Sequence, residues 1–410
     1  MDQPRGLFCD YVPGEALPLS PYPFPRLLRL GLIISFSQVC FFLLTNQFGI
    51  AALGLPSAYR DIGIVPGIIV TWGTVLLAWY TGYEFWRFYC RHPHCVTVID
   101  MARTAGGQFW EVIVGIAFVI QLNMCCASAS VTLPSGSTRL VIIPCAHIGV
   151  SKPNLAEDGW KPDLKVANNA GFNIIFNAVL KIVWAFAGHH AYVSYMAEMR
   201  DPVKDFPWAL SWLGVIGASF YRFLAVGIYC LSGEYTTSPA LGAAPRIAAK
   251  AAYGIVIPAI VTAALANGHI SIKYVFVVVM RKMNALNEIT ASTPKSWGVW
   301  VTIATVFWIV AFIISNAIPI FDSLVSIQSA TTYAWFSFGI ASAFWFSWNK
   351  GNYFKNPKQI AFFCLNVSIV GWAFFLNGCG VGSSITQMLD IFASDRGVNG
   401  SFSCGDNSAL

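Results

Sequence analysis

Long apolar runs alternate with short polar segments along most of the chain. A helix needs about 20 mostly apolar residues to cross the hydrocarbon core of a bilayer. Runs of that length predict membrane-spanning helices at Leu30–Ala52, Val65–Phe85, Trp110–Val131, Phe172–Met196, Leu210–Leu231, Ala252–Val278, Trp297–Phe321, Leu324–Trp348 and Ile360–Val381. Tryptophan and tyrosine gather at the ends of these runs, as is typical where membrane helices meet the lipid–water interface. The pattern therefore predicts an all-α polytopic membrane protein with about nine spans.

Two of these runs are interrupted by residues that break helices. Glycine and proline interrupt the first run between Gly49 and Pro56, and Gly188 interrupts the fourth between Ala185 and His190. A broken helix exposes backbone N–H and C=O groups inside the membrane, which is tolerated where they line a cavity or bind a ligand. Glycine that eases helix packing, or the ordinary end of a helix, would give the same pattern. The breaks are therefore candidate binding sites, with packing as the alternative.

The composition supports lipid as the solvent of this chain. Of its 410 residues, 56% are hydrophobic and 11% are charged, whereas soluble domains carry about 25% charged residues. A soluble fold would have to expose large apolar patches to accommodate this composition. The net charge of +6 is small and the basic residues lie mostly in the polar segments, which argues against a nucleic-acid-binding surface.

Side chains suited to catalysis or metal binding are scattered rather than clustered. The 11 cysteines form no CxxC pair, and the sequence contains no HExxH, phosphate-binding loop or GxSxG motif. A membrane-embedded enzyme would need such a cluster. We therefore expect neither enzymatic activity nor a cofactor.

The distribution of basic residues predicts the orientation in the membrane. Cytoplasmic loops carry an excess of Lys and Arg, and most of these residues fall on the side of the N-terminus. Residues 1–29 are therefore predicted to form a cytoplasmic tail, and residues 384–410 a tail on the opposite side. Residues 134–170 are predicted to be an outer loop, because their apolar run is short and contains Pro144 and His147.

Short motifs occur in three groups along the chain. They are GLPSA at 54–58, GIVPG at 63–67 and YTGY at 80–83, then FAGH at 186–189, EMRDP at 198–202 and DFP at 205–207, then SPALG at 238–242, AYGI at 252–255 and NGH at 267–269. In this order and spacing they resemble the fungal neutral amino acid permeases of the amino acid/auxin permease family, within the APC superfamily.

The resemblance implies a secondary transporter fold with a five-plus-five inverted repeat and one further helix, here covering residues 30–383. Members of the family usually have eleven spans. The segment 134–170 has room for a loop but not for the expected fourth and fifth helices, so this chain is predicted to lack that pair.

The resemblance also implies a substrate site between the two broken helices. The site is expected to use Gly49, Ile50, Ala51, Ala52, Leu53, Phe186, Ala187 and Gly188. The substrate would be a neutral amino acid, imported by alternating access and proton symport, with Na+ as a second candidate coupling ion. The plasma membrane is the expected location, with the vacuolar membrane as the alternative.

Three titratable residues near the second break are candidates for proton coupling or gating. His189 titrates near neutral pH when unperturbed, although a histidine hydrogen-bonded to nearby backbone is the alternative. Lys181 lies seven residues before Gly188, on the same helix face, and a charge there needs a partner or water. Glu198 begins a charged elbow that would act as a gate or form a solvated loop.

A non-transporting protein is the alternative function. A nutrient sensor, or a truncated product without activity, would also explain a chain that lacks two helices of the first repeat. Amino acid uptake by the correctly localised protein separates these possibilities.

Overall fold

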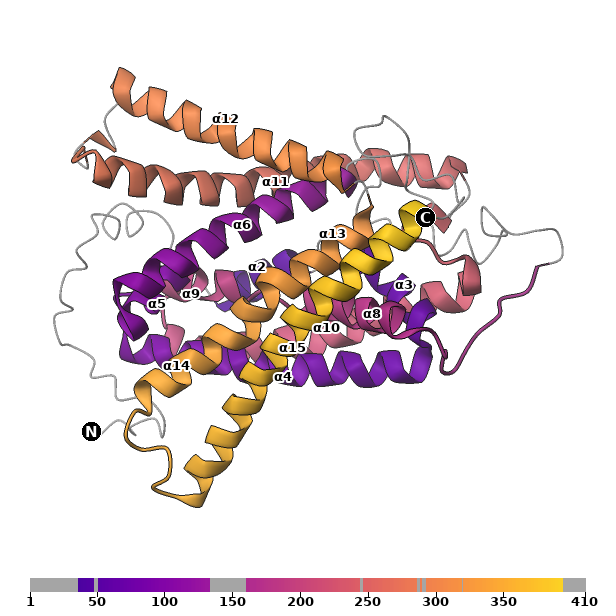
Figure 1. The fold of residues 1–410 in the computed structure, drawn as a ribbon, viewed down its shortest axis with the longest axis horizontal. Coiled ribbons are helices and arrows are strands. Elements are labelled where there is room, and N and C mark those ends of the chain that lie inside the picture. Colours follow the sequence, from indigo (N-terminus) through magenta and orange to yellow (C-terminus); the bar gives the residue numbers. More distant parts are fainter. Residues whose placement is uncertain are drawn as a thin grey trace.

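The computed structural model describes residues 36–47, 51–132, 160–243, 246–285, 288–289, 293–318 and 320–393. Its elements in these ranges are helices, drawn in Figure 1. They are α2 (Phe36–Gln47), α3 (Ala51–Ile62), α4 (Ile64–Arg91), α5 (Val98–Gly106), α6 (Gln108–Thr132), α8 (Phe172–Ala185), α9 (His189–Glu198), α10 (Pro202–Ser232), α11 (Arg246–Lys282), α12 (Pro294–Ala317), α13 (Phe321–Gln328), α14 (Ile340–Trp348) and α15 (Pro357–Ala393). Short 3-10 helices cover Gly233–Tyr235 and Ala240–Ala243, and π-helical turns cover Ser329–Tyr333 and Trp335–Gly339.

The helices follow the predicted spans closely. Within the described residues, seven stretches are long and apolar enough to cross a membrane, and they correspond to α4, α6, α8 with α9, α10, α11, α12 and α15. The first predicted span covers α2 and only the start of α3, so most of α3 lies beyond it, and the eighth span covers most of α13 to α14. The prediction of an all-α polytopic membrane protein is confirmed, while the inverted repeat stays a prediction.

The predicted first break does not include Gly54 and Pro56. Helix α2 spans Phe36–Gln47 and α3 spans Ala51–Ile62, so both residues lie inside a helix. Proline inside a helix removes one backbone hydrogen bond, a loss that neighbouring helices and side chains can make good in a membrane protein. Gly49 and Ile50 lie outside the described residues.

The second break is present where the sequence predicts it. Helix α8 ends at Ala185 and α9 begins at His189. The last turn of α8 tightens as the Phe186 and Ala187 N–H groups donate to the Val183 and Trp184 carbonyls at 3.2 and 3.3 Å. The chain then passes Gly188 and starts a new helix.

Helices α3 and α8 pack against each other in opposite directions. At the end of α3, the Ile62 carbonyl accepts a hydrogen bond from the Asn168 N–H, just before α8 begins. The two helices have 12 and 14 residues, so at about 1.5 Å per residue they are nearly equal in length. The start of α3 and the end of α8 therefore lie at about the same depth, which is the level of the second break.

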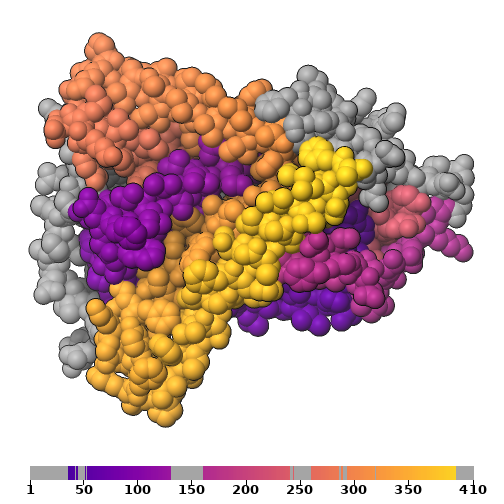
Figure 2. Space-filling view, viewed as in Figure 1, coloured from indigo at the N-terminus to yellow at the C-terminus, as the bar shows by residue number. Residues whose placement is uncertain are grey.

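The broken pair α8–α9 lies at the centre of the molecule. In its most apolar stretch 72% of the residues are buried, compared with 17% in α12 and 22% in α15. Helix α15 crosses the face seen in Figure 2 and α12 lies along one edge. The peripheral helices are thus placed to face lipid, while the broken helices are enclosed by protein.

Two predicted segments outside the spans are partly described. Helix α15 continues to Ala393, so residues 384–393 of the predicted C-terminal tail are helical. The described end of the outer loop, residues 160–171, runs along the turn between α3 and α4, where the Val65 N–H donates to the Val166 carbonyl at 3.0 Å. Residues 1–29, 134–159 and 394–410 lie outside the described residues.

Candidate functional site

Lys181 lies in a buried ionic cluster about one turn before the end of α8. Its side chain is 2% exposed, and its Nζ atom lies 2.8 Å from Asp322 Oδ2 and 3.1 Å from Asp61 Oδ2. It also donates to Ser57 Oγ at 2.9 Å. The cluster joins α3, α8 and α13, three helices that are far apart in sequence. We call Arg60, Asp61, Lys181 and Asp322 the ionic cluster.

The remaining members of the ionic cluster also have partners. Arg60 binds Asp61 Oδ1 at 2.9 Å and donates to the Thr236 carbonyl. The Ser238 hydroxyl donates to Asp322 Oδ1. The cluster therefore connects the segment after α10 to the same three helices. It lies at the end of the molecule that carries the turn at Gly63, which we call the Gly63 end.

Lys181 has the partner that the sequence predicts, and this partner is a pair of carboxylates from other helices. The sequence predicts that its charge has a partner or reaches water, without identifying the partner. In the structure two protein carboxylates already neutralise it. Sequence reasoning missed Asp61 and Asp322 because they lie 120 and 141 residues away along the chain, and only helix packing brings them together.

The structure brings several predicted substrate residues together. Ala51 and Leu53 at the start of α3 belong to the same buried apolar cluster as Phe186 in the second break. The Phe186 ring packs edge-on against Tyr221 of α10, with ring centroids 5.3 Å apart. Ala187 is buried beside it. The side chain of Ala52 lies outside the described residues, as do Gly49 and Ile50.

Gly188 is not required by the backbone at the second break. Its φ of −86° and ψ of 2° lie in the bridge region, which residues other than glycine also adopt. A side chain at this position would therefore act through the space that it fills, and not through backbone strain.

His189 is buried and hydrogen-bonded to backbone, which is the alternative left open by the sequence. Its Nε2 atom lies 3.0 Å from the Ala78 carbonyl and 3.0 Å from Thr81 Oγ1 of α4. A carbonyl only accepts hydrogen bonds, so this geometry assigns a proton to Nε2. Nδ1 is then an acceptor, and no described residue donates to it.

His190, to which the sequence gave no role, belongs to a second polar group. Its Nδ1 lies 3.0 Å from Gln121 Nε2 of α6, and its ring packs against Tyr333 at a centroid distance of 6.1 Å. Gln328 of α13 donates to the Gln121 carbonyl at 3.2 Å. The contact with Tyr333 falls on a π-helical turn, a feature frequent at functional sites.

Glu198 ends α9 at the opposite end of the molecule, which we call the Arg91 end. It is half-buried, and the nearest opposing charge acting on it is that of Lys273. A separate ionic contact at this end joins Glu111 to Arg103 at 3.3 Å and to Arg281 at 3.8 Å. Glu198 and the second break are thus on different levels of the molecule.

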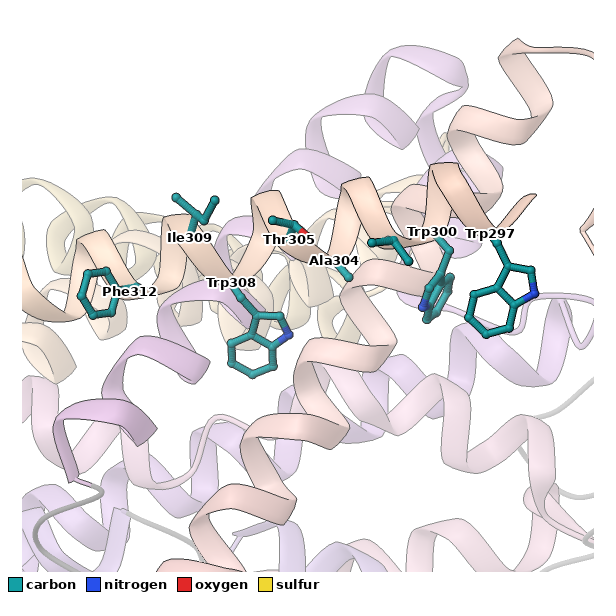
Figure 3. Close-up of a pocket in the computed structure, with 8 residues that line it drawn as sticks. Trp297, Trp300, Ala304, Thr305, Trp308, Ile309 and Phe312 are labelled. Atoms are coloured by element: carbon teal, nitrogen blue, oxygen red, sulfur yellow. The ribbon is translucent and has the colours of Figure 1, made fainter. Parts of the chain in front are cut away.

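The hollow seen in Figure 3 is separate from the helix breaks. Its volume is about 570 Å³, and its lining residues all belong to α12: Trp297, Trp300, Val301, Ala304, Thr305, Trp308, Ile309 and Phe312. Because α12 is a peripheral helix with an apolar outer face, we interpret this groove as lipid-facing surface. No predicted site residue lines it. Among the described residues, no group of three or more His, Cys, Asp or Glu side chains is placed to hold a metal ion.

Comparison with known proteins shows the family to which the chain belongs. A family described as transmembrane amino acid transporter protein matches residues 33–136 and 137–379. An N amino acid transport system protein of Neurospora crassa is 24% identical over 88% of this chain and 86% of that protein. A transmembrane transporter of Fusarium pseudograminearum is 24% identical and one of Gibberella moniliformis 23%, each over 92% of this chain and 88% of that protein. The chain therefore belongs to the transmembrane amino acid transporter protein family.

Proposed function

We propose that the protein imports neutral amino acids by alternating access, with the substrate held between the start of α3 and the break at residues 186–188. The observation that carries the proposal is the break between α8 and α9, which is enclosed by protein at the same depth as the start of α3. Half-helix ends offer backbone N–H and C=O groups that suit the carboxylate and ammonium of an amino acid.

A neutral substrate side chain suits the surroundings of the break. Ala51, Leu53 and Phe186 are apolar, and the charge of Lys181 is balanced by two carboxylates. An acidic or basic side chain placed there would lose its hydration without gaining a free counter-charge. We therefore propose substrates with uncharged, apolar side chains.

Two groups are proposed as gates. The ionic cluster, through Lys181, ties α8 to α3 and α13 and would close the Gly63 end. Glu198, under the influence of Lys273, would act at the Arg91 end. With the N-terminus in the cytoplasm, the Gly63 end faces outward, and we propose the plasma membrane as the site of action.

Uptake of radiolabelled amino acids by a permease-deficient host tests the proposed function. We expect saturable uptake of large neutral amino acids, which unlabelled neutral amino acids inhibit and glutamate or lysine does not. Gly188→Val should abolish this uptake because its branched side chain fills the break. Gly188→Ala is the matched control, since alanine adds a single methyl group and is expected to retain partial uptake. Full uptake by the correctly localised valine variant would remove Gly188 from the site.

Proton coupling is proposed to use His189. With Nε2–H held by the Ala78 carbonyl, Nδ1 is the nitrogen that a coupling proton would reach. His189→Ala should flatten the dependence of uptake on external pH. His190→Ala serves as the control, because that ring contacts Gln121 instead. A pH profile that His189→Ala leaves unaltered would contradict the role.

A protein that senses amino acids without moving them is the second candidate. Two parts of the family match meet at residues 136 and 137, inside the segment predicted to lack two helices. Such a protein would reach the membrane and bind amino acids, yet show no uptake. Binding measured on the purified protein together with uptake in cells distinguishes the two functions.

A further inference from the structure

The ammonium of Lys181 is enclosed by three oxygen atoms. Its Nζ atom lies 2.8 Å from Asp322 Oδ2, 3.1 Å from Asp61 Oδ2 and 2.9 Å from Ser57 Oγ. An ammonium has three N–H donors, so each donor has one acceptor. Ser57 gives its own hydroxyl hydrogen to the Gly54 carbonyl at 2.8 Å, which leaves its oxygen lone pairs for Lys181. We call these three side chains the oxygen cage.

The charges around the oxygen cage balance. Asp61 and Asp322 carry two negative charges, which Arg60 and Lys181 neutralise. Taking away only the charge of Lys181 leaves one net negative charge in a buried place, where an uncompensated charge is costly. One monovalent cation restores neutrality, whereas a divalent cation leaves an excess positive charge.

We propose that the oxygen cage is a monovalent-cation site whose resident ion is the chain's own Lys181 ammonium. Carboxylate and hydroxyl oxygens are the ligands that small hard cations prefer. Helices α3 and α13 supply these oxygens, and α8 supplies the tethered ion. In the native protein the tether keeps the cage filled whatever cation is in solution. Without the ammonium, the cage takes up Na+, K+ or a small alkylammonium ion.

Asp322 provides the way into the cage. Its side chain is 18% exposed, whereas that of Lys181 is 2% exposed. A small ion can therefore approach from the Gly63 end past Asp322. The space left by truncating lysine to alanine suits an ion as small as ethylammonium, because that ion resembles part of the side chain removed. It does not suit choline, whose trimethylammonium group is bulkier than the removed chain.

The test uses purified full-length protein in detergent and measures the midpoint of thermal unfolding. We expect Lys181→Ala to unfold at a lower temperature than the native protein. Addition of Na+, K+ or ethylammonium should raise the midpoint of the variant by several degrees in a saturable manner, because a ligand that binds only the folded state stabilises it. Choline chloride at the same ionic strength should not do so, and the native protein should respond to none of these ions.

Lys165→Ala is the matched control. Lys165 is an exposed lysine of the segment before α8, so its removal changes the net charge of the protein without opening the cage. Its unfolding midpoint should not depend on the choice of cation. Equal stabilisation of Lys181→Ala by choline and by Na+, or an absence of any cation response, would overturn the proposal.

A double variant covers the case in which Lys181→Ala does not accumulate. Lys181→Met with Asp322→Asn removes one positive and one negative charge together, so the buried charges balance again. The double variant should accumulate to a higher level than Lys181→Met alone and show no cation dependence. A double variant no better than the single one would also contradict the inference. These measurements do not involve transport, so a protein that moves no amino acid would still give the cation response.

Discussion

At the scale of single residues, the turn at Gly63 depends on the absence of a side chain there. It joins α3 to α4 with φ of 91° and ψ of 168°, a combination that is essentially restricted to glycine. A Cβ atom there would lie 2.6 Å from the Ala167 Cα and 2.9 Å from the Asn168 nitrogen. Both the backbone conformation and the close approach of residues 166–168 therefore require glycine at this position.

Gly63→Ala should destabilise the protein by about 1–3 kcal/mol from backbone strain, in addition to the clash. We expect a lower unfolding midpoint in detergent and less protein at the cell surface. Gly73→Ala in α4 is the control, because a Cβ atom there meets nothing within 4 Å, and alanine in a helix interior is favoured by about 0.5–1 kcal/mol. Equal midpoints for the two variants would contradict the argument.

At the scale of elements, α5 is a helix that the apolar pattern did not reveal. It is too short to span a membrane, and a capping box defines its start: Thr97 accepts from the Asp100 N–H while the Asp100 side chain accepts from the Thr97 N–H. The helix covers Cys95, whose Sγ lies 3.6 Å from Thr104 Oγ1. Burial raises the pKa of the Cys95 thiol to about 12, so it is almost entirely protonated, and hence unreactive, near neutral pH.

Thr97→Ala should loosen α5, because losing an N-cap costs about 0.5–2 kcal/mol. In a background that retains Cys95 alone among the cysteines, we expect faster labelling by a maleimide. Thr302→Ala provides the comparison, since Thr302 is an exposed residue in the interior of α12. If the labelling rate of Cys95 does not change in Thr97→Ala, the capping box does not hold α5 in place.

At the scale of the whole molecule, α13 is tied to α8 near its start and to α6 near its end. Asp322 binds Lys181 of α8 at 2.8 Å, and Gln328 binds the Gln121 carbonyl of α6. Two π-helical turns follow directly, and such turns interrupt the regular hydrogen-bond ladder of a helix. We therefore expect α13 to be held less firmly against α8 once the contact with Lys181 is broken.

Asp322→Asn should make the second break more accessible from the Gly63 end. A cysteine placed at Ala185, which is 2% exposed, reports this accessibility through labelling by a membrane-impermeant thiosulfonate added outside. We expect labelling about tenfold faster, the factor that 1.4 kcal/mol produces. Asp390→Asn, at an exposed position near the end of α15, should leave the rate unchanged. Slower or equal labelling in Asp322→Asn would show that this contact does not close that end.

The sequence predicted the existence of the helices better than the details of the first break. Apolar length locates the spans because the hydrocarbon core demands it, and Gly188 marks the second break correctly. The prediction that the first break extends to Pro56 was wrong, because a proline inside a membrane helix and a proline at a helix end look alike in sequence. The distinction depends on the residues packed around α3, which the sequence does not reveal.

The chain by itself determined that this protein is a bundle of membrane helices and that one of them is broken at Gly188, since both properties follow from local sequence. The tertiary structure alone decided which charges meet. An isolated charge on Lys181 would be too costly in lipid, so the sequence predicts a partner for it. The sequence does not say which acidic side chain is that partner. The packing of α3, α8 and α13 brings Asp61 and Asp322 into contact with Lys181, because contacts between distant segments are set by the fold as a whole.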